Sequence, residues 1–103
     1  VVGTPGGTTI PTSVFQTIVN VIDKNMDMQQ AVTSPRFHHQ WLPDVVTYEK
    51  NGFNESLIQQ LEKMGHKMEK RGAIGRVDAI LINPNGSYQG GADPRGDDKA
   101  IGY

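Results

Sequence analysis

The sequence predicts an α+β domain in which helices cover a sheet, and three observations lead to this class. Apolar residues recur at helical spacing between Ile10 and Ile22. Two later stretches, Val45–Glu49 and Val77–Asn83, are rich in the β-branched and aromatic residues that strands favour. The sequence Asn83-Pro84-Asn85-Gly86 is typical of a turn and predicts a hairpin with Ser87–Gly91.

Length and composition limit the possible classes of protein. The 103 residues, 36% of them hydrophobic, are enough for one domain with a modest core, and we expect a single domain over 1–103. With 10 basic and 11 acidic residues the net charge is −1, which gives no electrostatic reason to expect nucleic acid as a partner. The sequence has no cysteine, so a thiolate metal site and a cysteine nucleophile are excluded. We assign no cofactor and no metal.

The opening residues Val1-Val2-Gly3 have the composition of a strand that ends at a turn, and they lack an initiating Met. We therefore expect that a preceding segment has been removed. The domain should then expose apolar surface that once contacted that segment, and self-association is a possible result.

The first helix follows the turn Thr4-Pro5-Gly6-Gly7. Thr8 or Thr9 can cap it, and Pro11 suits its first turn. Its apolar residues form a broad stripe that we expect to be buried: Ile10, Val14, Phe15, Ile18, Val19, Val21 and Ile22.

The middle of the chain predicts a second helix, followed by an irregular connection. Asp27 and Gln30 form a capping-box pattern ahead of a helix over Met28–Thr33, which Pro35 ends. The segment Pro35–Asp44 has no period, and we expect it to be irregular and anchored by its large apolar residues, Phe37, Trp41 and Leu42.

The second half begins with a helix that Asn54 caps and Gly65 ends, with Leu57, Ile58, Leu61 and Met64 on its apolar face. His66–Arg71 is a weak candidate for an edge strand. The apolar run Val77–Asn83 predicts a strand covered on both faces. The tail Ala92–Tyr103 is polar, and we expect it to be irregular.

Gly6 and Gly7 are the candidate functional residues. They stand between a strand and the start of a helix, where unpaired backbone N–H groups and the positive end of the helix dipole favour negative charge. Glycine lets a ligand approach the backbone closely, so the two amides could hold an oxyanion, a carboxylate or a phosphate. The same sequence would also serve as a simple turn.

Other polar residues give weaker signals. His38 and His39 are adjacent and lack metal-ligand spacing, so ordinary hydrogen bonding is the expected role. The acidic residues show no spacing that pairs them, and a solvated surface or a turn is expected for Asp44, Asp93, Asp97 and Asp98.

Several motifs together resemble the C-terminal part of the small subunit of gamma-glutamyltranspeptidases. The first is Gly3-Thr4-Pro5-Gly6-Gly7 followed by the long helix. The most specific is Pro35-Arg36-Phe37-His38-His39-Gln40-Trp41-Leu42-Pro43-Asp44. Leu61–His66 and Gly91-Ala92-Asp93-Pro94-Arg95 follow in the family's order, with Gly102-Tyr103 at the end.

The resemblance implies an N-terminal nucleophile hydrolase, with this chain forming part of its layered αββα sandwich. In that family a precursor cleaves itself, and the new N-terminal threonine attacks a gamma-glutamyl amide such as glutathione, with its own α-amino group as base. The acyl-enzyme then passes the gamma-glutamyl group to water, an amino acid or a peptide. The glycine pair supplies backbone amides to the tetrahedral oxyanion, and the matching residues are Gly6 and Gly7.

The resemblance also implies what this chain lacks. The nucleophile lies upstream in the family, so none of Thr4, Thr8, Thr9 and Thr12 is assigned that role. Gly75–Ala79 departs from the small-polar-Gln stretch of many members, which leaves the role of that strand open. The chain alone should therefore be inactive.

The expected partners are the remainder of the small subunit, the large subunit of the same precursor and a gamma-glutamyl substrate. Periplasmic or extracellular placement is implied by the resemblance. Two alternatives stay open: a stand-alone module that binds an anion at the Pro5-Gly6-Gly7 helix start, and a scaffold in which neither glycine has a role.

Overall fold

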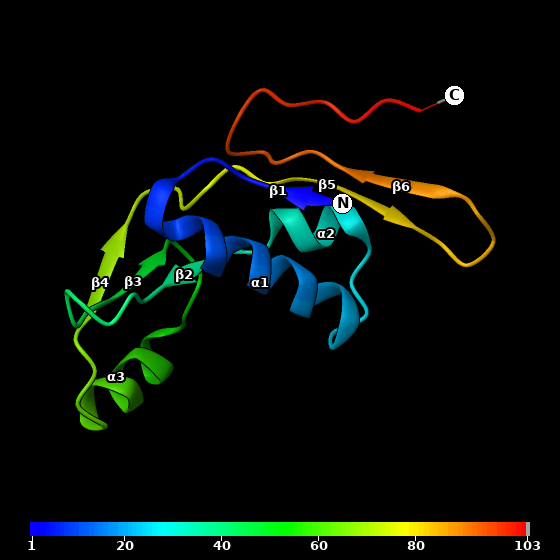
Figure 1. Ribbon diagram of the computed structural model, residues 1–103. Helices are drawn as coiled ribbons and strands as arrows, with labels where there is room; N and C mark the ends of the chain where they lie inside the picture. The colour runs from blue at the N-terminus through cyan, green and yellow to red at the C-terminus, as the bar shows by residue number, and fades with distance from the viewer. Residues whose placement is uncertain (103) are drawn as a thin grey trace.

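A computed structural model describes residues 1–102 as an elongated molecule, 49 × 25 × 21 Å, built from helices and two three-stranded sheets (Figure 1). The mixture confirms the α+β class. Tyr103 lies outside the described residues.

The first sheet contains β1 (Val2–Gly3), β5 (Asp78–Ile82) and β6 (Tyr88–Gly91), in the order β1-β5-β6 and antiparallel throughout. Val2 is opposite Ala79, which is also opposite Gly91. The predicted hairpin is confirmed: Asn83 N–H donates to Ser87 C=O at 2.8 Å, and Gly86 takes the left-handed conformation with φ +84°.

The second sheet contains β2 (Phe37–His38), β3 (Val46–Glu49) and β4 (Met68–Arg71). β2 and β3 are antiparallel, whereas β3 and β4 are parallel and are joined through α3 (Glu55–Lys63). The expectation that residues 35–44 form a wholly irregular connection is wrong, because β2 lies within this segment. The two residues of β2 pair with Thr47 and Tyr48 across the connection, and the sequence of β2 itself does not indicate this pairing.

The helix ends agree with the sequence prediction because local residues set them. In α2 (Met28–Thr33), Gln30 N–H donates to Asp27 Oδ1 at 2.7 Å and Asp27 N–H donates to Gln30 Oε1 at 3.0 Å, which is a complete capping box. Asn54 Oδ1 caps α3 through the Leu57 N–H, and Gly65 ends it with φ +101°. Within residues 1–102, no helix is both long enough and apolar enough to cross a membrane.

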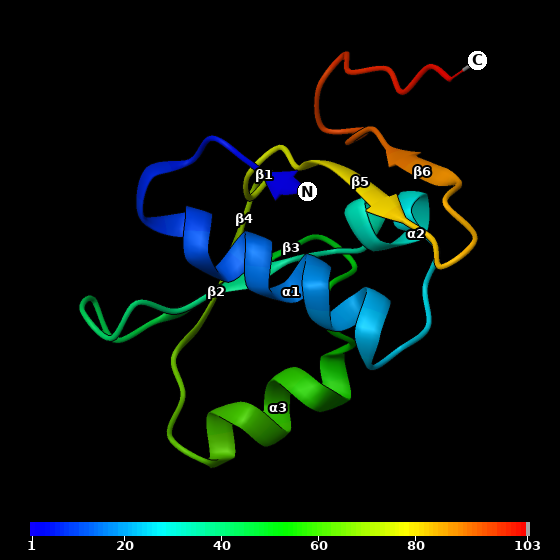
Figure 2. The same ribbon diagram turned by 45° about the vertical axis from the view of Figure 1, so that its right-hand side comes forward.

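The core lies between α2 and the first sheet, with α1 (Ile10–Ile22) on the same side (Figures 1 and 2). Its buried apolar side chains are Met28, Ala31, Val32, Val77 and Ala79. The opposite face of β5 stays open, with Ile80 at 48% exposure and Ile82 at 59%. The expectation that both faces of this strand are covered is therefore wrong within residues 1–102.

The side of α1 that is buried also differs from the prediction. The side of α1 that is buried carries Ser13, Thr17 and Asn20, while Phe15 is 65% exposed and Ile22 68%. Thr17 donates its hydroxyl hydrogen to the Ser13 carbonyl at 2.9 Å, which satisfies this group within the helix. Ile10, Phe15, Ile18 and Ile22 are exposed, whereas Val21 packs against the core, so an exposed apolar surface is present within residues 1–102.

The connection at 39–44 extends away from the body of the molecule (Figure 2). Trp41 is 77% exposed and Leu42 61%, so the prediction that they anchor this segment is wrong within residues 1–102. The segment is closed instead by polar contacts, since His39 Nε2 lies 3.0 Å from Asp44 Oδ1.

Candidate functional site

Gly6 and Gly7 lie between β1 and α1, at the start of the short 3-10 helix η1 (Gly7–Thr9). Gly6 has φ +139° and Gly7 has φ +61°, both in the region that L-residues rarely adopt. A Cβ at Gly6 would lie 2.5 Å from Thr9 Oγ1. Both the conformation and the close contact require glycine at position 6.

The two amides of this pair are available for a ligand. Within residues 1–102, neither Gly6 N–H nor Gly7 N–H donates a hydrogen bond, and both residues are exposed. The Gly6 carbonyl, in contrast, accepts from the Thr9 N–H at 3.2 Å and from the Thr9 hydroxyl at 3.0 Å. The pair therefore presents two free donors at the start of a helix, an arrangement that stabilises negative charge.

Thr9 differs from its expected role as a helix cap. It occupies the N-cap position of α1, but its side chain accepts no capping hydrogen bond. Its hydroxyl donates to the Gly6 carbonyl and so stabilises the glycine turn. Pro11 is in the first turn of α1, as the sequence predicts.

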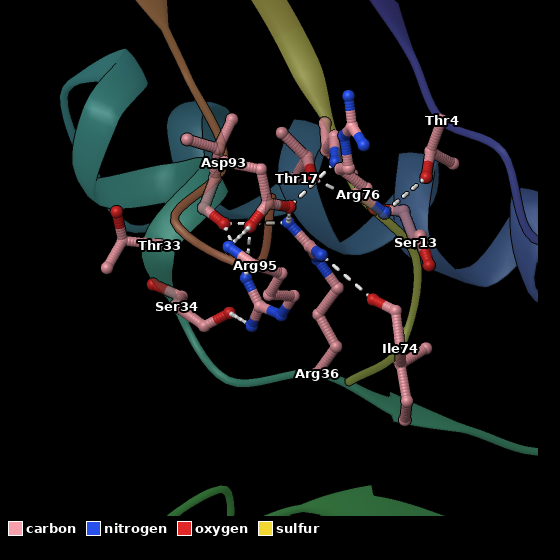
Figure 3. A network of polar contacts seen from close by, with 12 residues as sticks. Thr4, Ser13, Thr17, Thr33, Ser34, Arg36, Ile74, Arg76, Asp93 and Arg95 are labelled. Atoms are coloured by element: carbon pink, nitrogen blue, oxygen red, sulfur yellow. Dashed lines mark hydrogen bonds and ion pairs between the residues drawn. The ribbon is translucent and has the colours of Figure 1, made fainter. Parts of the chain in front are cut away.

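Four charged side chains contact one another and are here called the charge cluster: the buried Arg36, Glu49 and Asp93 and the half-buried Arg95. Arg36 Nη2 lies 2.7 Å from Asp93 Oδ2, and Arg95 Nη1 lies 2.9 Å from Asp93 Oδ1 (Figure 3). Arg95 Nη2 lies 2.5 Å from Glu49 Oε2. Asp93 is only 1% exposed, so the expectation of a solvated position is wrong for this residue, whereas a turn is present: the Asp93 carbonyl accepts from the Gly96 N–H at 3.2 Å.

The charge cluster also binds the backbone of residues 74–77. Ile74 N–H donates to Glu49 Oε1 and Val77 N–H to Asp93 Oδ2, both at 2.6 Å. Arg36 Nη1 donates to the Ile74 carbonyl at 2.8 Å. Because each carboxylate receives several donors, the cluster compensates the cost of burying its charges.

Donors lower the pKa values of both carboxyl groups in the cluster. Burial would raise the pKa of Asp93, but hydrogen bonds from the amides of Val77 and Arg95 and from two guanidinium groups outweigh it. Burial would likewise raise the pKa of Glu49, and the Arg95 guanidinium with the amides of Ile74 and Arg36 reverses the shift. Burial lowers the pKa of Arg36.

These shifts predict a loss of stability in acid. Because the folded pKa values of Asp93 and Glu49 lie below their unfolded values of about 4, their stabilisation is complete above about pH 4.5. It is lost as the pH falls through the lowered folded values. We expect the urea midpoint of the protein to decline below about pH 4, and to decline less steeply in Asp93→Asn. If the urea midpoint falls equally steeply with pH in the unmodified protein and in Asp93→Asn, this prediction is wrong.

The histidines and the remaining acidic residues make ordinary polar contacts. His38 is buried, with Nδ1 2.8 Å from Thr12 Oγ1 and Nε2 2.9 Å from Gln40 Oε1. Asp98 receives two 2.6 Å hydrogen bonds from Arg76. In the part of the chain that the structure describes, no group of three or more His, Asp or Glu side chains is placed to hold a metal ion.

Sequence reasoning did not find the charge cluster. The local signal is slight: Arg36 and Arg95 each follow a proline, in motifs that contribute only to the family resemblance. Arg36 and Asp93 are 57 positions apart, and Arg95 and Glu49 are 46 apart. No periodicity links residues at such separations.

Comparison with known proteins identifies the relatives of this chain. The gamma-glutamyltranspeptidase family matches residues 1–103. A glutathione hydrolase proenzyme of Escherichia coli is 43% identical over 104 residues, which cover all of this chain and 18% of that protein. The chain thus spans about a fifth of that relative.

Solved structures agree with the sequence comparison. A gamma-glutamyltranspeptidase of Pseudomonas nitroreducens, solved with L-DON, superposes with a TM-score of 0.90 at 35% identity, covering all of this chain and 54% of that one. A gamma-glutamyltranspeptidase of Helicobacter pylori gives a TM-score of 0.86 at 43% identity, covering 93% of this chain and 53% of that one. The described fold therefore matches part of such an enzyme chain, and this protein belongs to the gamma-glutamyltranspeptidase family.

Proposed function

We propose that this chain is the C-terminal part of the small subunit of a gamma-glutamyltransferase, and that Gly6 and Gly7 supply its oxyanion hole. The observation that carries the proposal is that both amides lack an acceptor within residues 1–102 and stand at the start of a helix. Donors fixed in this way stabilise the charge that develops when an amide carbonyl is attacked.

In the proposed reaction, a threonine from another part of the complete protein attacks the γ-carbonyl carbon of a gamma-glutamyl amide such as glutathione. A C–O bond forms, and the carbonyl oxygen carries the negative charge that the amides of Gly6 and Gly7 would stabilise. The proton of the threonine hydroxyl passes through the α-amino group of that threonine to the leaving nitrogen as the C–N bond breaks. Water or the amine of an amino acid then attacks the ester carbon, the C–O bond to threonine breaks, and the threonine oxygen takes back a proton from the attacking group.

The open surfaces support a role for this chain as one piece of a larger protein. The outer side of α1 exposes Ile10, Phe15, Ile18 and Ile22, and the outer face of β5 exposes Ile80 and Ile82. An uncovered apolar area of this kind is typical of an interface. This chain covers only 18% of the Escherichia coli proenzyme, so the remainder of the small subunit and the large subunit are the proposed partners that cover this area.

We propose that the complete protein lies in the periplasm or outside the cell, as the family resemblance implies. Fractionation of cells that produce it tests this placement. Recovery of the mature protein only in the cytoplasmic fraction would oppose it.

The activity can be tested on the complete processed protein with a gamma-glutamyl anilide as substrate. We expect anilide release, a covalent gamma-glutamyl adduct on the small subunit detected by mass spectrometry, and faster release when a dipeptide acceptor is added. Protein that is processed but releases no anilide would oppose the proposal. If phosphate, glutamate and glutathione all bind without turnover, the alternative of an anion-binding module would be favoured.

A further inference from the structure

The hydroxyl of Thr4 joins the glycine turn to a distant part of the chain. Thr4 Oγ1 accepts a hydrogen bond from Arg76 N–H at 2.8 Å (Figure 3). The same hydroxyl donates a hydrogen bond to the Pro5 carbonyl at 2.8 Å. The two residues joined by the first bond are 72 positions apart. One half-buried hydroxyl therefore connects the turn to residues 74–77.

The Pro5 carbonyl and the Gly6 N–H belong to the same peptide unit, which is planar. When the Thr4 hydroxyl holds this carbonyl, it also fixes the direction in which the Gly6 N–H points. Gly6 N–H is one of the two free donors, so the orientation of a proposed oxyanion donor depends directly on Thr4.

Close contact at Gly75 holds this arrangement in place. Gly75 has φ +69°, and a Cβ there would lie 2.9 Å from Thr4 Oγ1 and 2.9 Å from Ser13 Oγ. A Cβ at Gly6 would lie 3.8 Å from the Gly75 Cα. The backbone at Gly75 thus fits directly against the turn, and a side chain there would separate them.

The segment that Thr4 contacts is itself fixed. Ile74 and Val77 are fully buried, and Glu49 and Asp93 accept hydrogen bonds from their amides at 2.6 Å. The charge cluster therefore gives Arg76 N–H a defined position from which to hold Thr4.

We infer that Thr4 is a positioning residue for the oxyanion donors, acting through the Pro5–Gly6 peptide. The inference rests on the proposed function of Gly6 and Gly7. Without the hydroxyl, the peptide can rotate away from the direction needed in the transition state, while the surfaces that bind substrate in the ground state are unchanged. The loss should thus appear in kcat and not in KM.

The test uses the complete processed protein and steady-state turnover of a gamma-glutamyl anilide. We expect Thr4→Val to lower kcat on the order of tenfold, the amount set by one ordinary hydrogen bond, with KM within about twofold of the unmodified protein. Thr4→Ser keeps the hydroxyl and should restore most of the rate. Thr33→Val is the matched control: the Thr33 hydroxyl accepts from Gln29 at 3.1 Å on an exposed surface, and its loss should leave kcat unchanged.

Thr4→Ala is a second variant for the case in which Thr4→Val does not fold. It removes the hydroxyl without placing a methyl group against Arg76 N–H. A melting temperature for each variant establishes that folded protein is compared. Unchanged kcat in a folded Thr4→Val or Thr4→Ala would overturn the inference, as would a Thr4→Ser variant as slow as Thr4→Val. If removing the Gly7 N–H lowers kcat while these Thr4 variants stay fast, only the positioning role fails; if Gly7 also has no effect, the proposed function fails.

Discussion

Removing the Gly7 N–H from the complete protein is expected to lower kcat by about 10²–10³, the usual effect of losing one oxyanion-hole donor. Replacing Gly7 by glycolic acid makes this change cleanly, because an ester linkage lacks the N–H and keeps the freedom to adopt φ +61°. The measurement is kcat for a gamma-glutamyl anilide. KM should change little, since the donor acts mainly on the charge of the transition state.

Side-chain variants at this position serve as controls. Gly7→Ala keeps the N–H, and no atom lies within 4 Å of the added Cβ, so the cost is the left-handed conformation alone, about 1 kcal/mol. Its kcat should fall by less than about tenfold. Gly7→Pro is a poorer test, because its ring fixes φ near −65° and would reshape the turn. An ester variant as fast as the unmodified protein would exclude Gly7 as a donor.

Asp93→Ala is expected to cause the largest loss of stability, about 3–5 kcal/mol. The substitution leaves the Arg36 guanidinium, which is 2% exposed, without its carboxylate partner in the interior. It also removes the acceptor of the Val77 N–H. The free energy of unfolding can be measured in urea on the complete protein, where the loss should lower the midpoint.

Two further variants make the test specific to the buried pair. Asp97→Ala removes a carboxylate that is 99% exposed, so its midpoint should not move. Combining Asp93→Ala with Arg36→Met should recover part of the loss, because no unpaired charge then remains at position 36. If Asp93→Ala is no worse than Asp97→Ala, the charge cluster does not stabilise the fold.

The sequence predicts the elements that local chemistry defines. The Asp27–Gln30 capping box, the Asn54 cap and Gly65 each act within one helical turn, and the structure confirms them. The position of Gly6 and Gly7 between β1 and α1 was predictable for the same reason. Their role as oxyanion donors stays a prediction.

The errors concern which surfaces are buried. A period of apolar residues indicates that one side of α1 is apolar, but Phe15 and Ile22 are exposed in residues 1–102 while Ser13 and Thr17 are buried. Periodicity shows that one side of a helix is apolar, but it cannot show whether that side packs against residues of the same chain. Asp93 was missed for the opposite reason, because its partner Arg36 is distant in sequence and brought near only by the fold.

The distance along the chain between these partners affects the order of assembly during translation. The backbone hydrogen bonds of α1 and α2 join residues that are close in sequence. Arg76 must follow before Thr4 has its hydrogen-bond partner, and Asp93 must follow before Val77 has an acceptor. The glycine turn is therefore among the first parts of this chain to be synthesised and among the last to reach its final geometry.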